Sequence, residues 1–244
     1  MKKFIIYSLL LLVTLSFSQC EIDNYPEPEA SIEGKILDAN GAMLQTEQGG
    51  GNMKLKLEEL SWAGDDTTIA IIPSYLTVKQ DGSFNNSKIF SGEYRITPIE
   101  GPFYPYNEEG ELVNVSGHTT IDFQVTPYLN IEWVTEPRLT VDNFIEADVR
   151  FTRNQKEGES APDLNDARLY ISTTKYCGNN NYDNQLVAAP LSINNNQEGQ
   201  TIHLMTFRAV KYVGTTYYVR VGINCKDTYK KYNYTDIKTV VVGP

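Results

Sequence analysis

The chain of 244 residues is predicted to be all-β, with two tandem β-sandwiches. Three observations favour this fold class. Apolar and polar residues alternate with a period of two in many short segments, residue types that favour strands are abundant (16 of the chain's aromatics are tyrosines), and glycine-containing turns separate the segments. No sustained apolar repeat at helical spacing follows the first 19 residues. We therefore expect no more than a turn or two of helix.

Residues 1–19 are predicted to be an export signal. Lys2 and Lys3 precede an apolar run over residues 4–17. Ser18 and Gln19 separate that run from Cys20. The run is too short for a comfortable bilayer span, which needs roughly 20 residues. A basic start, an apolar core and a short polar exit are typical of a signal peptide rather than of a structural helix.

The segment from Leu15 to Cys20 resembles a bacterial lipoprotein signal, in which the cysteine sulfur receives diacylglycerol and the chain is cut just before it. The resemblance implies lipidation of Cys20 and a membrane as partner. Phe17 and Gln19 depart from the strict pattern, which has a small residue directly before the cysteine. A plain secreted protein is the alternative. The acyl chains of a lipoprotein exceed the two-signal threshold for stable anchoring.

Residues 20–30 are predicted to form a solvated acidic tether, because a segment of this composition cannot bury apolar area. Its acids and prolines are Glu21, Asp23, Pro26, Glu27, Pro28 and Glu29. The segment also resembles the acidic export signal that sends Bacteroidota lipoproteins to the outer face of the outer membrane. That resemblance implies an outer-membrane protein facing the cell exterior. The alternative is a linker that carries no export signal.

The charge of the exported chain argues against a polyanionic partner. Loss of the signal removes two of 21 basic residues and leaves 19 against 31 acids, a net charge of −12. Such a protein repels nucleic acid, and no basic stripe that could follow phosphates occurs in the sequence. We expect no nucleic-acid partner.

Residues 31–126 are predicted to form the first sandwich. Residues 53–58 and 121–125 alternate between apolar and polar side chains, as strands with one buried face do. Turn signals separate the strands at Asn40-Gly41, Asp81-Gly82 and Ser91-Gly92. The boundary is placed near Thr126-Pro127.

Residues 127–244 are predicted to form an immunoglobulin- or fibronectin-III-like sandwich of seven short strands. The strands are expected at about 129–134, 145–153, 167–174, 186–193, 201–208, 216–224 and 236–242. Alternation places Trp133 in the core. It also places Tyr170, Tyr218 and Arg220 on faces that meet water.

Several motifs resemble a known family. Residues 31–38, with Leu44-Gln45-Thr46-Glu47, resemble the opening of a carboxypeptidase-regulatory-like (transthyretin-like) module, and residues 81–84 and 91–96 match its later part. Residues 20–25, 178–184 and 232–235 supply further motifs. The order of all these motifs along the chain resembles that in a family of two-domain Bacteroidota lipoproteins of uncharacterised function. The resemblance covers the whole mature chain. Its members are typically encoded beside starch-utilisation-type importers.

The resemblance implies a transthyretin-like first sandwich. It also implies a surface accessory protein in glycan capture, with a glycan and an outer-membrane importer complex as partners. It brings no catalytic residues. A structural or adhesive module that binds a protein partner is the alternative function.

No motif for catalysis, a cofactor or a metal is found in the sequence. The two histidines, His118 and His203, lie far apart, and no Cys or His spacing suits zinc. No Gly-x-Ser-x-Gly elbow occurs, and Gly49-Gly50-Gly51 lacks the lysine of a phosphate loop. A glycosidase pair of carboxylates remains an alternative, although two small sandwiches offer little room for its cleft. We expect a protein that is not an enzyme.

Cys177 and Cys225 are candidates for a disulfide, because exported proteins form them. The first follows the third expected strand of the second sandwich, and the second follows the sixth. If these strands are antiparallel neighbours, the two cysteines lie at opposite ends unless the asparagine-rich loop folds back along the sheet. The free and bridged states are both left open.

Glycan binding is predicted in the loops at 176–184 and 226–235, which carry the densest mixture of tyrosine and asparagine. Tyrosine offers a rigid flat face for a sugar, and asparagine both donates to and accepts from hydroxyls. The candidates are Tyr182, Tyr229 and Tyr232 for stacking, with Asn180 and Asp183 as polar partners. Packing within their own loops is the alternative for each.

Two further groups of loop aromatics are candidates for sugar contact. Phe103-Tyr104-Pro105-Tyr106 lies in a loop rich in proline and glycine, and Trp62 precedes Ala63-Gly64 at an expected strand exit. Packing against the loop or a domain interface is again the alternative.

Overall fold

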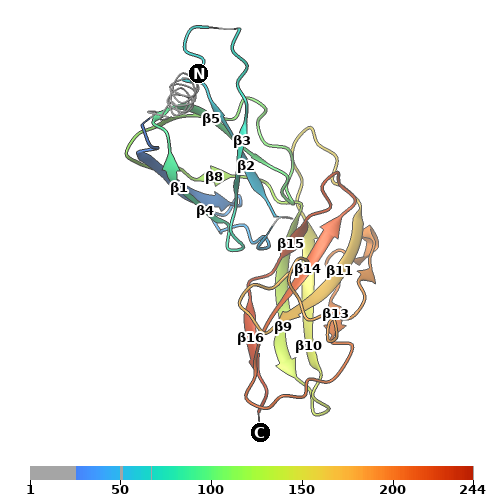
Figure 1. Ribbon diagram of the computed structural model, residues 1–244. Coiled ribbons are helices and arrows are strands. Elements are labelled where there is room, and N and C mark those ends of the chain that lie inside the picture. The colour runs from blue at the N-terminus through green and yellow to red at the C-terminus, as the bar shows by residue number, and fades with distance from the viewer. Residues whose placement is uncertain (1–25, 50–51, 67, 244) are drawn as a thin grey trace, which may run out of the picture.

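The computed structural model describes residues 26–49, 52–66 and 68–243, which form two β-sandwiches arranged end to end (Figure 1). The predicted all-β class is confirmed. Within the described residues, one 3-10 turn, η1 (Asn195–Gln197), is the whole helical content. The same ranges contain no helix with the length and apolar character to cross a membrane. Cys20 and the predicted signal lie outside the described residues.

The first sandwich packs two four-stranded sheets around one core. One sheet has the order β4 (Ser83–Ile89), β1 (Ala30–Leu37), β7 (His118–Thr120), with β8 (Phe123–Gln124) also paired with β1. The other has the order β3 (Ser74–Thr77), β2 (Lys54–Glu59), β5 (Gly92–Ile99), β6 (Glu111–Val115). Alternate residues of each strand face inward, as in β1, where Ile32 and Ile36 are buried. Strand β1 starts at Ala30, so the last residue of the predicted tether is a core residue.

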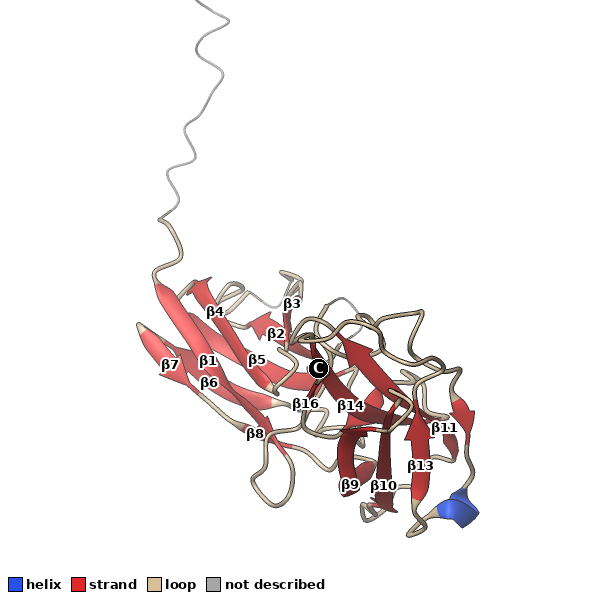
Figure 2. Ribbon diagram, turned by 90° about the horizontal axis from the view of Figure 1, so that it is seen from below, coloured by secondary structure: helices blue, strands red, loops and turns tan. Residues whose placement is uncertain are grey.

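The second sandwich packs a three-stranded sheet against a five-stranded sheet around its own core (Figure 2). One sheet has the order β13 (Ile202–Met205), β10 (Ile145–Arg153), β9 (Leu129–Leu139). The other has the order β12 (Leu191–Ser192), β11 (Leu164–Ser172), β14 (Thr216–Cys225), β15 (Tyr232–Tyr234), with β16 (Lys238–Val241) also on β14. The sequence did not predict β15. Trp133, predicted to be core, is half-buried at the core's edge, where its Nε1 donates to Asp236 at 2.8 Å.

One strand face that the sequence assigns to water is in fact covered. Arg220 on β14 and Tyr170 on β11 lie opposite each other on the outer face of their sheet, and both are fully buried. The loop at 173–184 folds back over this face, since Asn179 Oδ1 accepts from the Tyr170 hydroxyl at 3.1 Å. Residues of the first sandwich complete the cover, because Arg220 Nη1 donates to the Thr46 carbonyl at 2.6 Å. The outer face of β11 and β14 is therefore the docking surface for the first sandwich.

A buried charged cluster lies at this junction. The Arg220 guanidinium stacks on Tyr234, with 3.7 Å between its central carbon and the ring centroid. The buried Glu47 carboxylate accepts from the Tyr234 hydroxyl at 3.2 Å and from the Asn180 amide at 2.9 Å. Burial raises the pKa of Glu47, and the nearby charge of Arg220 opposes that shift. The cluster joins β14, β15, the 173–184 loop and the first sandwich.

Further hydrogen bonds surround this cluster and fix the arrangement of the sandwiches. The Gln80 side chain donates to the Lys175 carbonyl at 2.7 Å and accepts from the Cys177 amide at 3.1 Å. Asn233 Nδ2 donates to the Pro102 carbonyl at 3.0 Å. The link between β8 and β9 is also short, so the two sandwiches have little freedom to move apart.

Replacing the buried arginine should weaken the whole molecule. In Arg220→Ala, the Thr46 carbonyl loses its donor, and the Glu47 carboxylate loses one of the two cations that act on it, the other being Lys231. Removing one partner from a buried charged cluster costs about 3–5 kcal/mol, so we expect a large fall in the free energy of unfolding, measured by urea denaturation.

Arg150→Ala is the matched control. The Arg150 side chain is 44% exposed and makes one 3.5 Å contact with Glu132. Loss of an exposed pair costs about 0–1 kcal/mol. Equal stability of the two variants would contradict the structural role of Arg220.

Candidate ligand site at the domain junction

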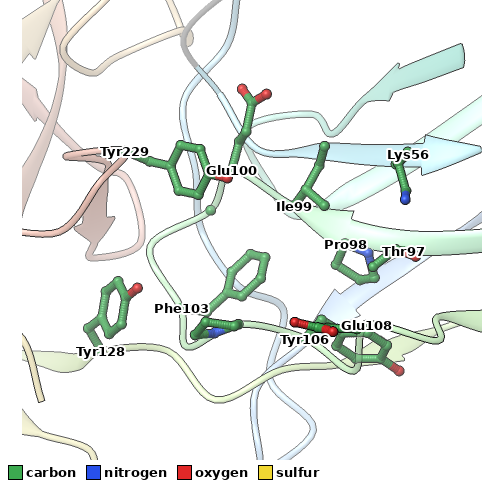
Figure 3. A pocket seen from close by; sticks show the side chains of 12 residues that line it. Lys56, Thr97, Pro98, Ile99, Glu100, Phe103, Tyr106, Glu108, Tyr128 and Tyr229 are labelled. Carbon is green, nitrogen blue, oxygen red and sulfur yellow. The ribbon is translucent and has the colours of Figure 1, made fainter. Parts of the chain in front are cut away.

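A pocket with a volume of about 330 Å³ opens beside the junction (Figure 3). This volume lies at the lower end of the range for small-molecule sites, which is roughly 300–1,000 Å³. The first sandwich supplies most of the wall, and the second supplies two tyrosines. The lining residues are Lys56, Thr97, Pro98, Ile99, Glu100, Gly101, Phe103, Pro105, Tyr106, Glu108, Tyr128 and Tyr229.

Aromatic rings form much of the pocket wall. Tyr128 and Tyr229 stand on one side of it, and Tyr106 lies on the other (Figure 3). Tyr128 is half-buried and packs edge-on against Tyr104, with ring centroids 4.9 Å apart. Tyr229 is 49% exposed and lies within an exposed loop between β14 and β15. One ring is therefore fixed by packing and another remains free to cover a ligand.

The turn after β5 places Phe103 at the base of this wall. Glu100 has a positive φ of 56°, which reverses the chain directly after the strand. A Cβ atom on Gly101 would come within 1.8 Å of the Phe103 ring, so the close approach of that ring requires glycine. The Tyr104 amide then donates to the Thr126 carbonyl at 2.9 Å and holds the loop against the domain boundary.

The charged groups of the pocket are predominantly acidic. Glu100 pairs with Lys54 at 2.8 Å, and Glu108 is exposed at the opposite edge. Lys56 is the cation in the lining, and its ammonium forms an ion pair with Glu58 at 3.0 Å. A ligand with a negative charge would meet carboxylates that are only partly compensated. Hydroxyl groups, in contrast, can donate to these carboxylates.

Two hydroxyls complete the polar lining. Tyr106 donates to Glu111 at 2.8 Å, and burial together with this bond raises the pKa of Tyr106 to about 12. The Thr97 hydroxyl is buried and has no hydrogen-bond partner among the described residues. The Thr97 oxygen is covered by Gly110, so it belongs to the wall of the pocket and is not a group that a ligand can reach.

The predicted trio of stacking tyrosines does not form one surface. Tyr229 alone of the three lines the pocket. Tyr232 is buried, and its hydroxyl donates to Asp166 at 2.7 Å. Tyr182 is half-buried beneath the Arg168 guanidinium, 4.6 Å from its ring centroid. Both rings pack on the covered outer face of the β11–β14–β15 sheet, so the structure does not bring them together with Tyr229.

The two predicted polar partners have structural contacts. The Asn180 amide donates to Glu47 within the junction cluster. Asp183 Oδ1 accepts from the Gln185 amide at 2.9 Å, which is a local turn. Neither residue lines the pocket. Phe103 and Tyr106, which the sequence offered as loop aromatics, do line it.

The two cysteines of the second sandwich are not bridged. Both are free and buried. Cys177 lies beside the Tyr218 carbonyl, 3.4 Å from its Sγ, while Cys225 is paired with Leu164 at the far end of β14. Seven strand residues separate these positions, roughly 23 Å, well beyond disulfide reach. Burial raises the pKa of each thiol to about 12.

Thiol titration tests this arrangement. In a recombinant chain carrying Cys20→Ser, an aromatic disulfide reagent should label neither Cys177 nor Cys225 in the folded state, because both thiols are buried and protonated. Both should react at once in denaturant. Failure of both to react in denaturant without a reductant would reveal a disulfide.

These features define a two-domain β-sandwich protein with an aromatic pocket at the domain junction. A family described as "Protein of unknown function (DUF3823) N-terminal domain" matches residues 30–126. A second, described as "Domain of unknown function (DUF3823_C)", matches residues 139–239. The chain belongs to the DUF3823 family.

Solved structures resemble the chain over most of its length. A DUF3823 family protein from Bacteroides uniformis is 25% identical, with a TM-score of 0.73, over 88% of this chain and 100% of that one. A DUF3823 family protein from Parabacteroides merdae is 22% identical, with a TM-score of 0.67, over the same shares. A third, from Bacteroides uniformis, is described as a proposed carbohydrate binding protein and is 20% identical, with a TM-score of 0.66, over 88% and 100%. No match is found among curated proteins.

Proposed function

We propose that this protein is a lipid-anchored, outer-membrane protein that binds a neutral glycan in the junction pocket. The observation that carries the proposal is the pairing of exposed and half-buried aromatic faces with hydrogen-bonding groups in one hollow. The apolar face of a sugar ring stacks on aromatic rings, and its hydroxyls require donors and acceptors around the edge.

The polar groups of the pocket favour a neutral sugar over an acidic one. Glu100 and Glu108 can accept hydrogen bonds from sugar hydroxyls, and Lys56 can donate to them. A uronate or a sulfated sugar would bring its charge close to two carboxylates. The net charge of −12 for the exported chain acts in the same direction at longer range.

The family context supports a role in glycan capture. One similar structure is described as a proposed carbohydrate binding protein. The residues that resemble accessory lipoproteins of starch-utilisation-type systems point to the same role, with an importer complex as partner. The protein would then hold a glycan near the cell surface without cleaving it.

Removal of the exposed pocket tyrosine should weaken glycan binding. Tyr229→Ala takes away one stacking face, and the half-exposed side chain contributes little to the core. We expect about tenfold weaker binding, equivalent to about 1.4 kcal/mol, measured by affinity electrophoresis on a panel of neutral and acidic polysaccharides.

Tyr212→Ala is the control for this experiment. Tyr212 is 71% exposed and does not line the pocket. Its loss should leave retention on a responsive neutral glycan unchanged. Equal retention of Tyr229→Ala and the parent protein, or a preference for acidic glycans, would overturn the proposed site.

The anchor has a separate test. Cys20→Ala should release the protein from cell membranes and leave its signal uncut, because both lipid attachment and cleavage need that sulfur. Membrane fractionation and mass spectrometry report the two effects. Normal processing of the variant would contradict the lipoprotein assignment and leave the glycan site untouched.

A further inference from the structure

Large apolar side chains are exposed at one end of the first sandwich. Trp62 is 68% exposed and Ile72 is 85% exposed, both in the loop between β2 and β3. The two side chains line one shallow hollow together with Ala70 and Ile71. Phe90, in the turn between β4 and β5, is also exposed. We call Trp62, Ile72 and Phe90 the apolar tip.

The apolar tip lies at the end of the sandwich where the tether enters. The first residue of β1, Ala30, pairs with Ile89, and the Ser91 amide donates to Glu29 at 3.2 Å. These contacts place the 90–91 turn beside the tether. The amide of Leu60, at the start of the 60–73 loop, donates to the Glu93 carbonyl at 2.7 Å and brings that loop to the same end.

The opposite end of the first sandwich faces the second sandwich. Thr46 and Pro102, which contact the second sandwich, lie in loops that join the other ends of the strands. Figure 1 shows the loop between β2 and β3 at the end of the molecule farthest from the second sandwich. The apolar tip and the junction pocket are therefore at opposite ends of the first sandwich.

The length of the tether places a lipid anchor near the apolar tip. Ala30 is the tenth residue after Cys20, and an extended chain of ten residues spans at most about 35 Å. A bilayer that holds acyl chains on Cys20 therefore lies within reach of the end that carries Trp62 and Ile72. Within the described residues, no other segment covers Trp62 and Ile72, which stay exposed.

We infer that the apolar tip rests in the interface of the bilayer that holds the lipid anchor; the inference rests on the proposed lipidation of Cys20. Tryptophan favours the membrane interface, because its ring is apolar while its N–H can bond to headgroups and water. The loop backbone carries N–H and C=O groups that would lose their hydrogen bonds in the hydrocarbon core. Contact is therefore limited to the headgroup region. The tip adds a second, weak attachment that orients the first sandwich.

The charges around the tip select the type of membrane surface. Asp65 and Asp66 lie in the Trp62 loop, and Glu27 and Glu29 lie in the tether itself, with Lys88 paired to Glu27. Acids outnumber bases at this end. These charges favour contact with a zwitterionic surface, such as phosphatidylcholine, over contact with an anionic one.

Tryptophan fluorescence can test the inference because the chain has two tryptophans, Trp62 and Trp133. The full lipidated protein is placed on phosphatidylcholine vesicles with or without brominated acyl chains. In Trp133→Phe, which leaves Trp62 as the reporter, bromine should lower the emission about twofold, since interfacial side chains reach the acyl boundary. In Trp62→Phe, the emission of Trp133 in the second sandwich should not change.

A second variant keeps the test independent of the anchor. Ile72→Asp in the Trp133→Phe background should remove most of the quenching while the protein stays bound to vesicles, because Ile72 is 85% exposed and its replacement leaves the core intact. Equal Trp62 emission from brominated and unbrominated vesicles would overturn the inference. A chain without lipid by mass spectrometry would overturn both the anchor and the inference, whereas glycan retention reports on the pocket alone.

Discussion

The buried guanidinium of Arg220 is the constraint on which the arrangement of this protein depends. A cation cannot leave water without compensation, and here the compensation comes from both sandwiches: the Thr46 carbonyl and Glu47 from one, and the Tyr234 ring from the other. Other relative positions of the sandwiches would take the Thr46 carbonyl and Glu47 away from this charge. The junction pocket has walls from both sandwiches, so its shape depends on the same docking. Stability and the shape of the candidate pocket are therefore linked through one side chain.

The alternation of side chains predicts the inner faces well and the outer faces poorly. Val219, Val221 and Ile223 are buried as their spacing predicts. Arg220, one position away, follows the same pattern as an exposed residue and yet is fully buried. A period of two shows which residues share a face, but it does not show whether a loop or another domain covers the second face. A polar strand face that carries an arginine among tyrosines is a signal of such cover.

The candidate site shows a similar limit. Composition identified loops rich in tyrosine and asparagine, but a lid that packs on a sheet and a platform that binds sugar have the same composition. The hydroxyl of Tyr232 donates to Asp166, and Tyr182 stacks beneath Arg168. Both contacts join residues that are distant in the chain, so local composition does not reveal them. Phe103 and Tyr106 were recognisable because they stand among prolines and a glycine in a predicted loop, although Phe103 is itself buried in the first core. Tyr128 and Lys56 reach the pocket only through tertiary structure, and the sequence offers no local sign of it.

The placement of these features along the molecule bears on how it would work at a surface. The tether and the apolar tip share one end of the first sandwich, and the junction pocket lies at the other. If the first end contacts a bilayer, the pocket is raised by about the length of one sandwich, and an eight-residue strand spans roughly 27 Å. The short link and the Arg220 cluster then prevent the second sandwich from folding down over the membrane. A rigid junction would therefore hold the pocket open toward polymers that diffuse past the cell, which a flexible pair of domains could not do.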